Sequence, residues 1–257
     1  MNATAIIQAR MGSTRLPGKV LLPLFDKTVL GQVICRLQAS EMLQAVMVAT
    51  TVCAEDDKIV ADARQYGVGV YRGSEEDVLR RFYEASLQTD SDWIVRITAD
   101  CPLMDGKLVD AMLRDVSQRL DPLDYLSNTL LRTFPRGLDV EIIAKRALHA
   151  AHACAELRVE REHVTPFIYR HPERYRLAIY AQEVDHSHHR WTLDTKEDWL
   201  LIQAIYQHLY GKNPLFSWQD ALQFVEQHPE IASLNREVRQ KEIDLADMGG
   251  AAHAEPS

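Results

Sequence analysis

The chain has 257 residues, of which 46% are hydrophobic and 26% are charged, as is usual for a folded soluble protein. This length suits one large α/β domain with room for a sizeable core. The formal net charge of −8, together with the lack of a lysine- or arginine-rich run, argues against binding to nucleic acid or to an anionic membrane surface.

The cysteines and the apolar runs indicate a cytoplasmic protein. The four cysteines are scattered without a CxxC pair, as is typical of free thiols in a reducing compartment. The first apolar run, 5–7, is too short for a signal peptide, and no segment approaches the roughly 20 apolar residues of a membrane span. We therefore expect neither export nor a membrane partner.

Short apolar strands alternate with amphipathic helices over the first half of the chain. This alternation predicts a three-layer α/β fold, in which helices cover both faces of a mostly parallel sheet. Ligands of such sheets bind beyond the carboxyl ends of the strands, so the residues that follow each strand are candidates for a site. In chain order we expect a strand at 4–9, a helix at 29–39, a strand at 45–49, a helix at 56–66, a strand at 68–71, a helix at 77–87, a strand at 93–97 and a helix at 108–120.

The second half of the chain is less regular. We expect a smaller insertion over roughly 125–189, specific for the second substrate, with strands at 138–143 and 175–180 and a helix at 145–155. Residues 190–193 are then expected to return to the main sheet as a strand, before helices at 196–210 and 217–227. These elements make one domain over 1–240, and the tail 241–257 is expected to be flexible.

A basic loop follows the first expected strand. The run Gln8–Lys19 (QARMGSTRLPGK) carries three cations and two glycines and has no acidic residue. Glycines let the backbone N–H groups approach a phosphate, and Arg10, Arg15 and Lys19 would neutralise a triphosphate. The alternative is a surface turn with scattered charges.

Two known phosphate-binding motifs do not fit this loop. Five residues separate Gly12 from Gly18 where a P-loop has four, and Val20 stands where a P-loop needs Ser or Thr. The chain also lacks a GxGxxG, which argues against a dinucleotide site.

Carboxylates end two of the expected strands. Asp100 follows the strand at 93–97, and Asp194 follows the strand at 190–193. Two acids at neighbouring strand ends could share a metal that bridges phosphate oxygens. Either aspartate could instead only cap the next helix. Thr195 and Asp198 have near capping-box spacing, and Asp198 is also expected to serve the helix dipole.

These features together resemble the cytidylyltransferases, which include the synthetases of CMP-3-deoxy-manno-octulosonate and CMP-acylneuraminate. The nearest match is the spore-coat polysaccharide branch. The resemblance covers about residues 4 to 240 and includes the runs Arg72–Leu79 (RGSEEDVL), Phe134–Glu141 (FPRGLDVE) and Arg161–Pro166 (REHVTP). It implies a fold of the nucleotide-diphospho-sugar transferase type, whose insertion binds the sugar and contributes to a homodimer.

The resemblance also implies an activity and its residues. The protein would use Mg²⁺ to transfer CMP from CTP to a sugar, expected to be a sugar acid, with release of pyrophosphate, for surface polysaccharide synthesis. The implied catalytic residues are Lys19, Arg10 and Arg15; the nucleotide-binding residues are Ala9, Arg10, Gly12, Ser13, Ser74 and Asp100; the sugar-binding residues are Arg136, Asp139, Glu141 and His163; and the Mg²⁺ ligands are Asp100 and Asp194.

Three other functions remain open at this stage. A glycosyltransferase of the GT-A type shares such a sheet, but Pro102 stands where its DxD motif needs the second acid. A uridylyl- or guanylyltransferase acting on a sugar phosphate would differ in few contacts. A non-catalytic nucleotide-binding subunit is the third, although the presence of Lys19, Asp100 and Asp194 together argues against it.

Overall fold

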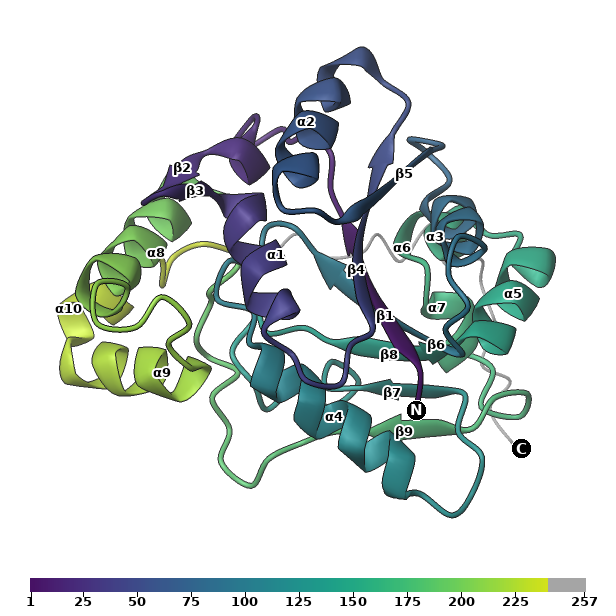
Figure 1. Ribbon diagram of the computed structural model, residues 1–257. Coiled ribbons are helices and arrows are strands. Elements are labelled where there is room, and N and C mark those ends of the chain that lie inside the picture. The colour runs from purple at the N-terminus through teal and green to yellow at the C-terminus, as the bar shows by residue number, and fades with distance from the viewer. Residues whose placement is uncertain (240–257) are drawn as a thin grey trace, which may run out of the picture.

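A computed structural model describes residues 1–239, whose strands form a seven-stranded sheet and a short hairpin (Figure 1). The order across the sheet is β5-β4-β1-β6-β8-β7-β9. The strands are β1 (Ala3–Gln8), β4 (Ala45–Thr51), β5 (Gly69–Gly73), β6 (Trp93–Thr98), β7 (Tyr125–Ser127), β8 (Glu141–Ala144) and β9 (Leu177–Ile179), and the hairpin joins β2 (Pro23–Leu24) to β3 (Lys27–Thr28). Among these described strands of the sheet, β8 runs antiparallel to both of its neighbours and the other pairs are parallel.

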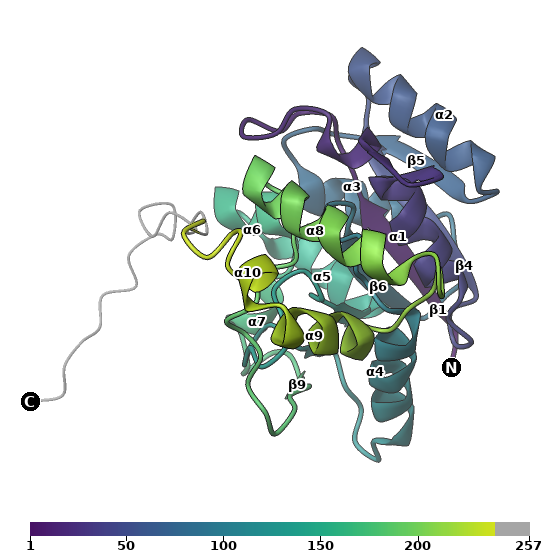
Figure 2. The same cartoon turned by 90° about the vertical axis from the view of Figure 1, so that its left-hand side faces the viewer.

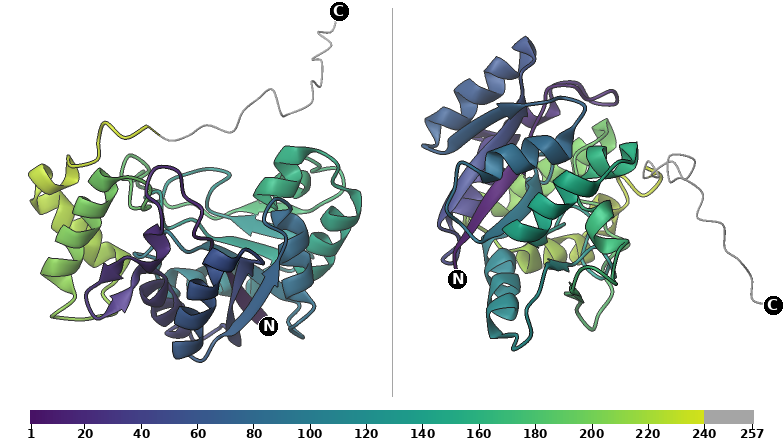
Figure 3. Two further views of the ribbon diagram at one scale, coloured as in Figure 1. Left: turned by 90° about the horizontal axis from the view of Figure 1, so that it is seen from above. Right: turned by 90° about the vertical axis from the view of Figure 1, so that its right-hand side faces the viewer.

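Helices cover both faces of this sheet, as the views in Figures 2 and 3 show. One face carries α1 (Val29–Gln38), α2 (Asp57–Gln65) and α4 (Gly106–Gln118), with α8 (Lys196–Leu209), α9 (Trp218–Gln227) and the short α10 (Pro229–Ala232) beside them. The other face carries α3 (Val78–Ser86), α5 (Lys145–Cys154), α6 (Arg158–His163) and α7 (Pro166–Tyr169). The predicted three-layer α/β fold is confirmed.

The central strand shows why its sequence is apolar throughout. Successive side chains of a strand point to opposite faces of the sheet. In β1, Ala5 and Ile7 pack with the helices of the first face, whereas Ile6 packs with those of the second, and all three are fully buried. A strand covered on both sides therefore reads as a continuous apolar run.

Most predicted elements are present. Each helix and strand expected before residue 120 is found, with ends that differ by at most two residues. Five further features were not predicted, because they contain too few residues to show a period: the β2–β3 hairpin, β7 and the short helices α6, α7 and α10. The segment 125–189 contributes β7, β8 and β9 to the main sheet. The predicted tail 241–257 lies outside the described residues.

The strand predicted at 190–193 is wrong. Within the described chain this segment forms a single bridge, between Arg190 and Arg136, and no ladder with a strand of the sheet. Its backbone N–H groups bond to two different loops: Trp191 N donates to Arg136 O at 2.6 Å, and Leu193 N donates to Asp100 O at 2.8 Å. The buried side chains of Trp191 and Leu193 explain the strand-like pattern, because burial alone produces an apolar run.

Gly137 makes the close approach of this segment possible. Its φ is +104°, and a Cβ at this position would lie 2.6 Å from the carbonyl carbon of Trp191. We expect Gly137→Ala to lower the free energy of unfolding by about 1–3 kcal/mol, because both the backbone strain and the clash oppose the side chain. Urea unfolding measures this loss. Gly211→Ala is the matched control, because a Cβ there meets nothing within 4 Å; equal effects of the two substitutions would contradict the assignment.

Candidate active site

The basic loop between β1 and the 3-10 helix η1 (Lys19–Leu21) is held in a defined shape. Gly18 has a φ of 68° and donates its N–H to Met11 O at 3.3 Å, which closes the loop. Buried Asp56 anchors the start of the loop, where its carboxylate accepts hydrogen bonds from Met11 N at 2.8 Å and from the Thr51 hydroxyl at 2.6 Å. Nothing in the sequence pattern pointed to Asp56, because its partners come from separate segments.

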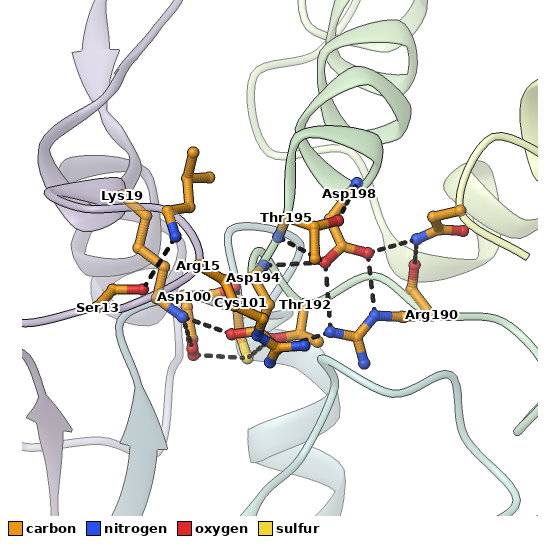
Figure 4. Close-up of polar contacts among 12 residues, drawn as sticks. Ser13, Arg15, Lys19, Asp100, Cys101, Arg190, Thr192, Asp194, Thr195 and Asp198 are labelled. Carbon is orange, nitrogen blue, oxygen red and sulfur yellow. Dashed lines mark hydrogen bonds and ion pairs between the residues drawn. The ribbon is translucent and has the colours of Figure 1, made fainter. Parts of the chain in front are cut away.

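Lys19 lies between the two aspartates predicted at the strand ends (Figure 4). Its Nζ donates to Asp100 Oδ2 at 2.6 Å and to Asp194 Oδ1 at 2.7 Å. Asp100 follows β6, which pairs directly with β1, so the basic loop and Asp100 leave the same edge of the sheet. Asp194 precedes α8 and reaches this edge because Leu193 bonds to Asp100 O. The structure thus brings the three predicted residues together.

The charges of Lys19 and the aspartates stabilise one another despite partial burial. Burial alone would lower the pKa of Lys19, but the charges of Asp100 and Asp194 outweigh it and raise this pKa above its ordinary value. Burial would likewise raise the pKa of Asp194, yet the nearby cations Lys19 and Arg15 hold it below its usual range. Lys19 and Asp194 are therefore both charged at neutral pH.

A second layer of charges fixes Asp194. Its Oδ2 accepts from Arg15 Nη2 at 3.0 Å and from Arg190 Nη2 at 2.6 Å. Asp198 is fully buried and accepts from Arg190 Nε at 3.0 Å, from the backbone N of Asp194 at 2.9 Å and from Asn235 Nδ2 at 2.8 Å. The capping box predicted between Thr195 and Asp198 is present. Asp198 thus caps α8 and also orients Asp194 through Arg190, a role that the sequence analysis missed.

The residues predicted to bind the nucleotide come from the basic loop, from Ser74 after β5 and from Asp100 after β6. Arg10 lines a cavity of about 730 Å³ together with Glu75 and Asp77, which follow Ser74. The Ser74 hydroxyl accepts from Asp77 N at 3.0 Å. Ala9, Gly12 and Ser13 lie in the basic loop: the N–H of buried Ala9 donates to Ala49 O at 3.2 Å, a Cβ at Gly12 would lie 3.8 Å from Glu75 Oε1, and Ser13 Oγ accepts from Leu16 N at 3.4 Å.

The residues predicted to bind the sugar fall into two groups. Asp139, Glu141 and His163 line a cavity of about 200 Å³. Arg136 lines a different cavity of about 420 Å³, beside Arg190 and Trp191.

Glu141 is fully engaged within the wall of the smaller cavity. It accepts from the hydroxyls of Tyr125 and Thr165, each at 2.5 Å, and pairs with Arg96. Arg132 holds Asp139 through two bonds of 2.5 and 2.9 Å. Burial lowers the pKa of His163, which is therefore neutral at neutral pH.

The donor set at Lys19 fits a divalent cation that arrives with a substrate. Within residues 1–239 no group of three or more His, Cys, Asp or Glu side chains could hold a metal ion by itself. Asp100 and Asp194 nevertheless converge on one cation, the Lys19 ammonium. Mg²⁺ prefers oxygen ligands and is commonly held by one or two carboxylates together with substrate phosphates. Two carboxylates match that pattern.

His189 gives the site region a dependence on pH. Burial, followed by the charges of His188 and His186, lowers its pKa from 6.5 to about 4. The unfolded chain then binds more protons than the folded one between these values, so we expect the free energy of unfolding to fall as pH drops through this window. Urea unfolding at several pH values tests this. His189→Gln should flatten the dependence, and an unchanged slope would contradict the assignment.

A basic loop after the first strand faces one carboxylate that follows β6 and another that precedes α8, an arrangement typical of an α/β protein of the nucleotidyltransferase class. A sequence profile described as cytidylyltransferase matches residues 4–211. The chain therefore belongs to the cytidylyltransferase family. No helix of the described chain is long and apolar enough to cross a membrane.

Individual relatives and solved structures resemble the chain over most of its length. The chain is 37% identical over 244 residues to an uncharacterized protein of Methanocaldococcus jannaschii, covering 94% of this chain and 97% of that one. It is 34% identical over 235 residues to the spore coat polysaccharide biosynthesis protein SpsF of Bacillus subtilis, covering 89% and 95%. A solved cytidylyltransferase from Leptospira borgpetersenii is 35% identical, with a TM-score of 0.86 over 94% of this chain and 99% of the other. A CMP-2-keto-3-deoxy-manno-octonic acid synthetase complexed with CTP shares the fold, with a TM-score of 0.62 at 17% identity, over 81% and 99% of the two chains.

Proposed function

We propose that the protein transfers CMP from CTP to a hydroxyl of a sugar acid and releases pyrophosphate, in a Mg²⁺-dependent reaction for surface polysaccharide synthesis. The observation that carries this proposal is the position of Lys19 between Asp100 and Asp194, beside a basic loop with Arg10 and Arg15. Family membership supports the cytidylyl group, and the similarity to SpsF supports the pathway.

The side chains of this site suit phosphoryl transfer. Arg10, Arg15 and Lys19 would hold the triphosphate and offset the charge that develops when pyrophosphate leaves. Asp100 and Asp194 would hold Mg²⁺, which when bound supplies a Lewis acid at the α-phosphate and lowers the pKa of a coordinated hydroxyl. Most of the rate enhancement would come from this positioning and from charge stabilisation.

The cavity of Asp139 and His163 is the proposed acceptor site. Asp139 is already neutralised by Arg132, so its carboxylate can accept hydrogen bonds from sugar hydroxyls without adding unpaired negative charge. His163 is neutral at neutral pH because burial lowers its pKa, which suits hydrogen bonding to a hydroxyl. Arg136, in the neighbouring cavity, supplies a cation for a sugar carboxylate.

We also propose that the enzyme works in the cytoplasm as a homodimer that pairs through the segment 125–189. This segment includes β9 at the edge of the sheet, where Ile179 is 50% exposed. An edge strand with an exposed apolar residue suits a symmetric contact between two copies. Sedimentation at two protein concentrations would show the oligomeric state, and a monomer at both concentrations would contradict the proposed dimer.

The first test is pyrophosphate release with CTP, Mg²⁺ and a panel of nine-, eight- and six-carbon sugars. UTP and GTP replace CTP as controls for the base, and Asp100→Asn is the control for the site. Release that requires CTP, one sugar acid and Asp100 would support the proposal. Release with UTP or GTP in place of CTP would replace it with another nucleotidyltransferase activity, and absence of CTP binding would overturn it.

A further inference from the structure

The carboxylates proposed to hold Mg²⁺ are already occupied by side-chain cations of the same chain. Lys19 Nζ lies 2.6 Å from Asp100 Oδ2 and 2.7 Å from Asp194 Oδ1. Arg15 and Arg190 occupy the other oxygen of Asp194, at 3.0 and 2.6 Å. These are full hydrogen-bond distances, so a metal ion cannot be bound between the two aspartates while Lys19 remains there.

The charges of this cluster balance without any ligand. Lys19, Arg15 and Arg190 face Asp100, Asp194 and Asp198, so three positive groups meet three negative ones. Adding a divalent cation alone would leave an excess of two positive charges in a partly buried site. If Lys19 and Arg15 move away as the cation enters, the balance is restored, because two single charges are exchanged for one double charge.

Lys19 and Arg15 need a new anionic partner when they leave. The Lys19 side chain is 11% exposed, so without such a partner its ammonium would lose both of its ion pairs while still partly buried. Such a loss is unfavourable. A triphosphate provides that partner and also the oxygen ligands that a pair of carboxylates cannot complete alone.

We infer that Lys19 and the divalent cation are alternative occupants of the Asp100–Asp194 pair, and that the cation therefore binds only together with a nucleotide. Arg190 stays in place during the exchange because buried Asp198 holds it from behind. By linkage, the nucleotide and the cation strengthen each other's binding by the same factor. This inference rests on the proposed function for the identity of the nucleotide.

Titration with Mn²⁺, followed by the loss of the free-ion electron paramagnetic resonance signal, tests the exchange without turnover. The wild type is expected to bind Mn²⁺ weakly in the absence of nucleotide. Lys19→Met removes the competing ammonium and keeps the length of the side chain, and should tighten Mn²⁺ binding by about 10-fold or more, within the usual range of coupling between sites. Lys27→Met is the matched control, because Lys27 pairs with Asp26 away from the site.

Thermal unfolding gives a second measurement that does not depend on metal affinity alone. Without Lys19 the two aspartates repel each other, so Mn²⁺ should raise the Tm of Lys19→Met but not that of the wild type. If Lys19→Met does not fold, the Tm of the wild type still tests the inference. A rise in its Tm with Mn²⁺ alone, as large as the rise with Mn²⁺ and CTP, would overturn the inference, and a rise that needs both would support it.

The outcomes separate this inference from the proposed function. Tight Mn²⁺ binding to the wild type without nucleotide would overturn the exchange, and so would unchanged Mn²⁺ binding to folded Lys19→Met. Neither result would affect the proposed function as long as the protein binds CTP. Calorimetry with Mn²⁺ and CTP, without an acceptor, measures CTP binding. Failure to bind CTP would overturn the proposed function, and the nucleotide-free comparison of the two proteins would still decide whether Lys19 excludes the cation.

Discussion

Lys19→Ala is expected to reduce kcat by about 10²–10³-fold, the usual effect of removing one donor that stabilises transition-state charge. Lys19 is the cation that contacts both carboxylates of the site, at 2.6 and 2.7 Å, and in our proposal it moves to the phosphates when CTP binds. The fold should persist, because Lys19 contacts Asp100 and Asp194 at the carboxyl end of the sheet and is not part of the apolar core. Steady-state pyrophosphate release measures the change, and circular dichroism checks the fold.

The control for this substitution is Lys27→Ala. Lys27 carries the same charge and sits in the β3 strand close along the chain, but its partners are Asp26 and Tyr210. We expect its kcat to stay near that of the wild type. A folded Lys19→Ala variant with wild-type turnover would refute the assignment of Lys19.

Asp198→Ala is expected to lower the free energy of unfolding by about 3–5 kcal/mol, the usual cost of breaking a buried ion pair, because Arg190 loses its pair with Asp198 and Asn235 loses an acceptor. Asp198 is fully buried, with 0% of its surface accessible to solvent. It bonds to the side chains of Arg190 and Asn235 and to the backbone N–H groups of Asp194 and Thr195. For a chain of this size the loss corresponds to a decrease in Tm of about 10 °C. Thermal unfolding measures it.

The neighbouring acid provides the comparison for this second substitution. Glu197 also lies in the first turn of α8 but is exposed, so Glu197→Ala should leave the Tm almost unchanged. If Asp198 served only the helix dipole, as the sequence analysis expected, the two substitutions would have similar small effects. Equal Tm values for the two variants would therefore contradict the role of Asp198 in the buried hydrogen-bond network with Arg190 and Asn235.

Several features of the protein could be predicted from the sequence because their causes are local. The alternation of buried strands and amphipathic helices fixed the order of elements up to residue 120, and the Thr195 capping box marked the start of α8. The basic loop and the strand-end position of Asp100 were also visible, because charge and chain order are enough to identify them.

Other features depend on contacts between distant segments. The apolar pattern of residues 190–193, which reflects the burial of Trp191 and Leu193, predicted a strand. Their backbone N–H groups instead bond to the loops at Arg136 and Asp100, and the local sequence contains no information on these partners. The anchoring role of Asp56 and the buried position of Asp198 likewise come from partners elsewhere in the chain.

The α/β architecture, the charged loop and the family follow from the order of the amino acids, because periodicity, composition and motif residues are local properties of the chain. Which charges meet depends on how the chain folds. Lys19 is 81 residues from Asp100 and 175 residues from Asp194, yet its ammonium lies between their carboxylates. The physical reason is that parallel pairing of β1 with β6 places their carboxyl ends at one edge, while the bond from Leu193 to Asp100 brings Asp194 to the same place.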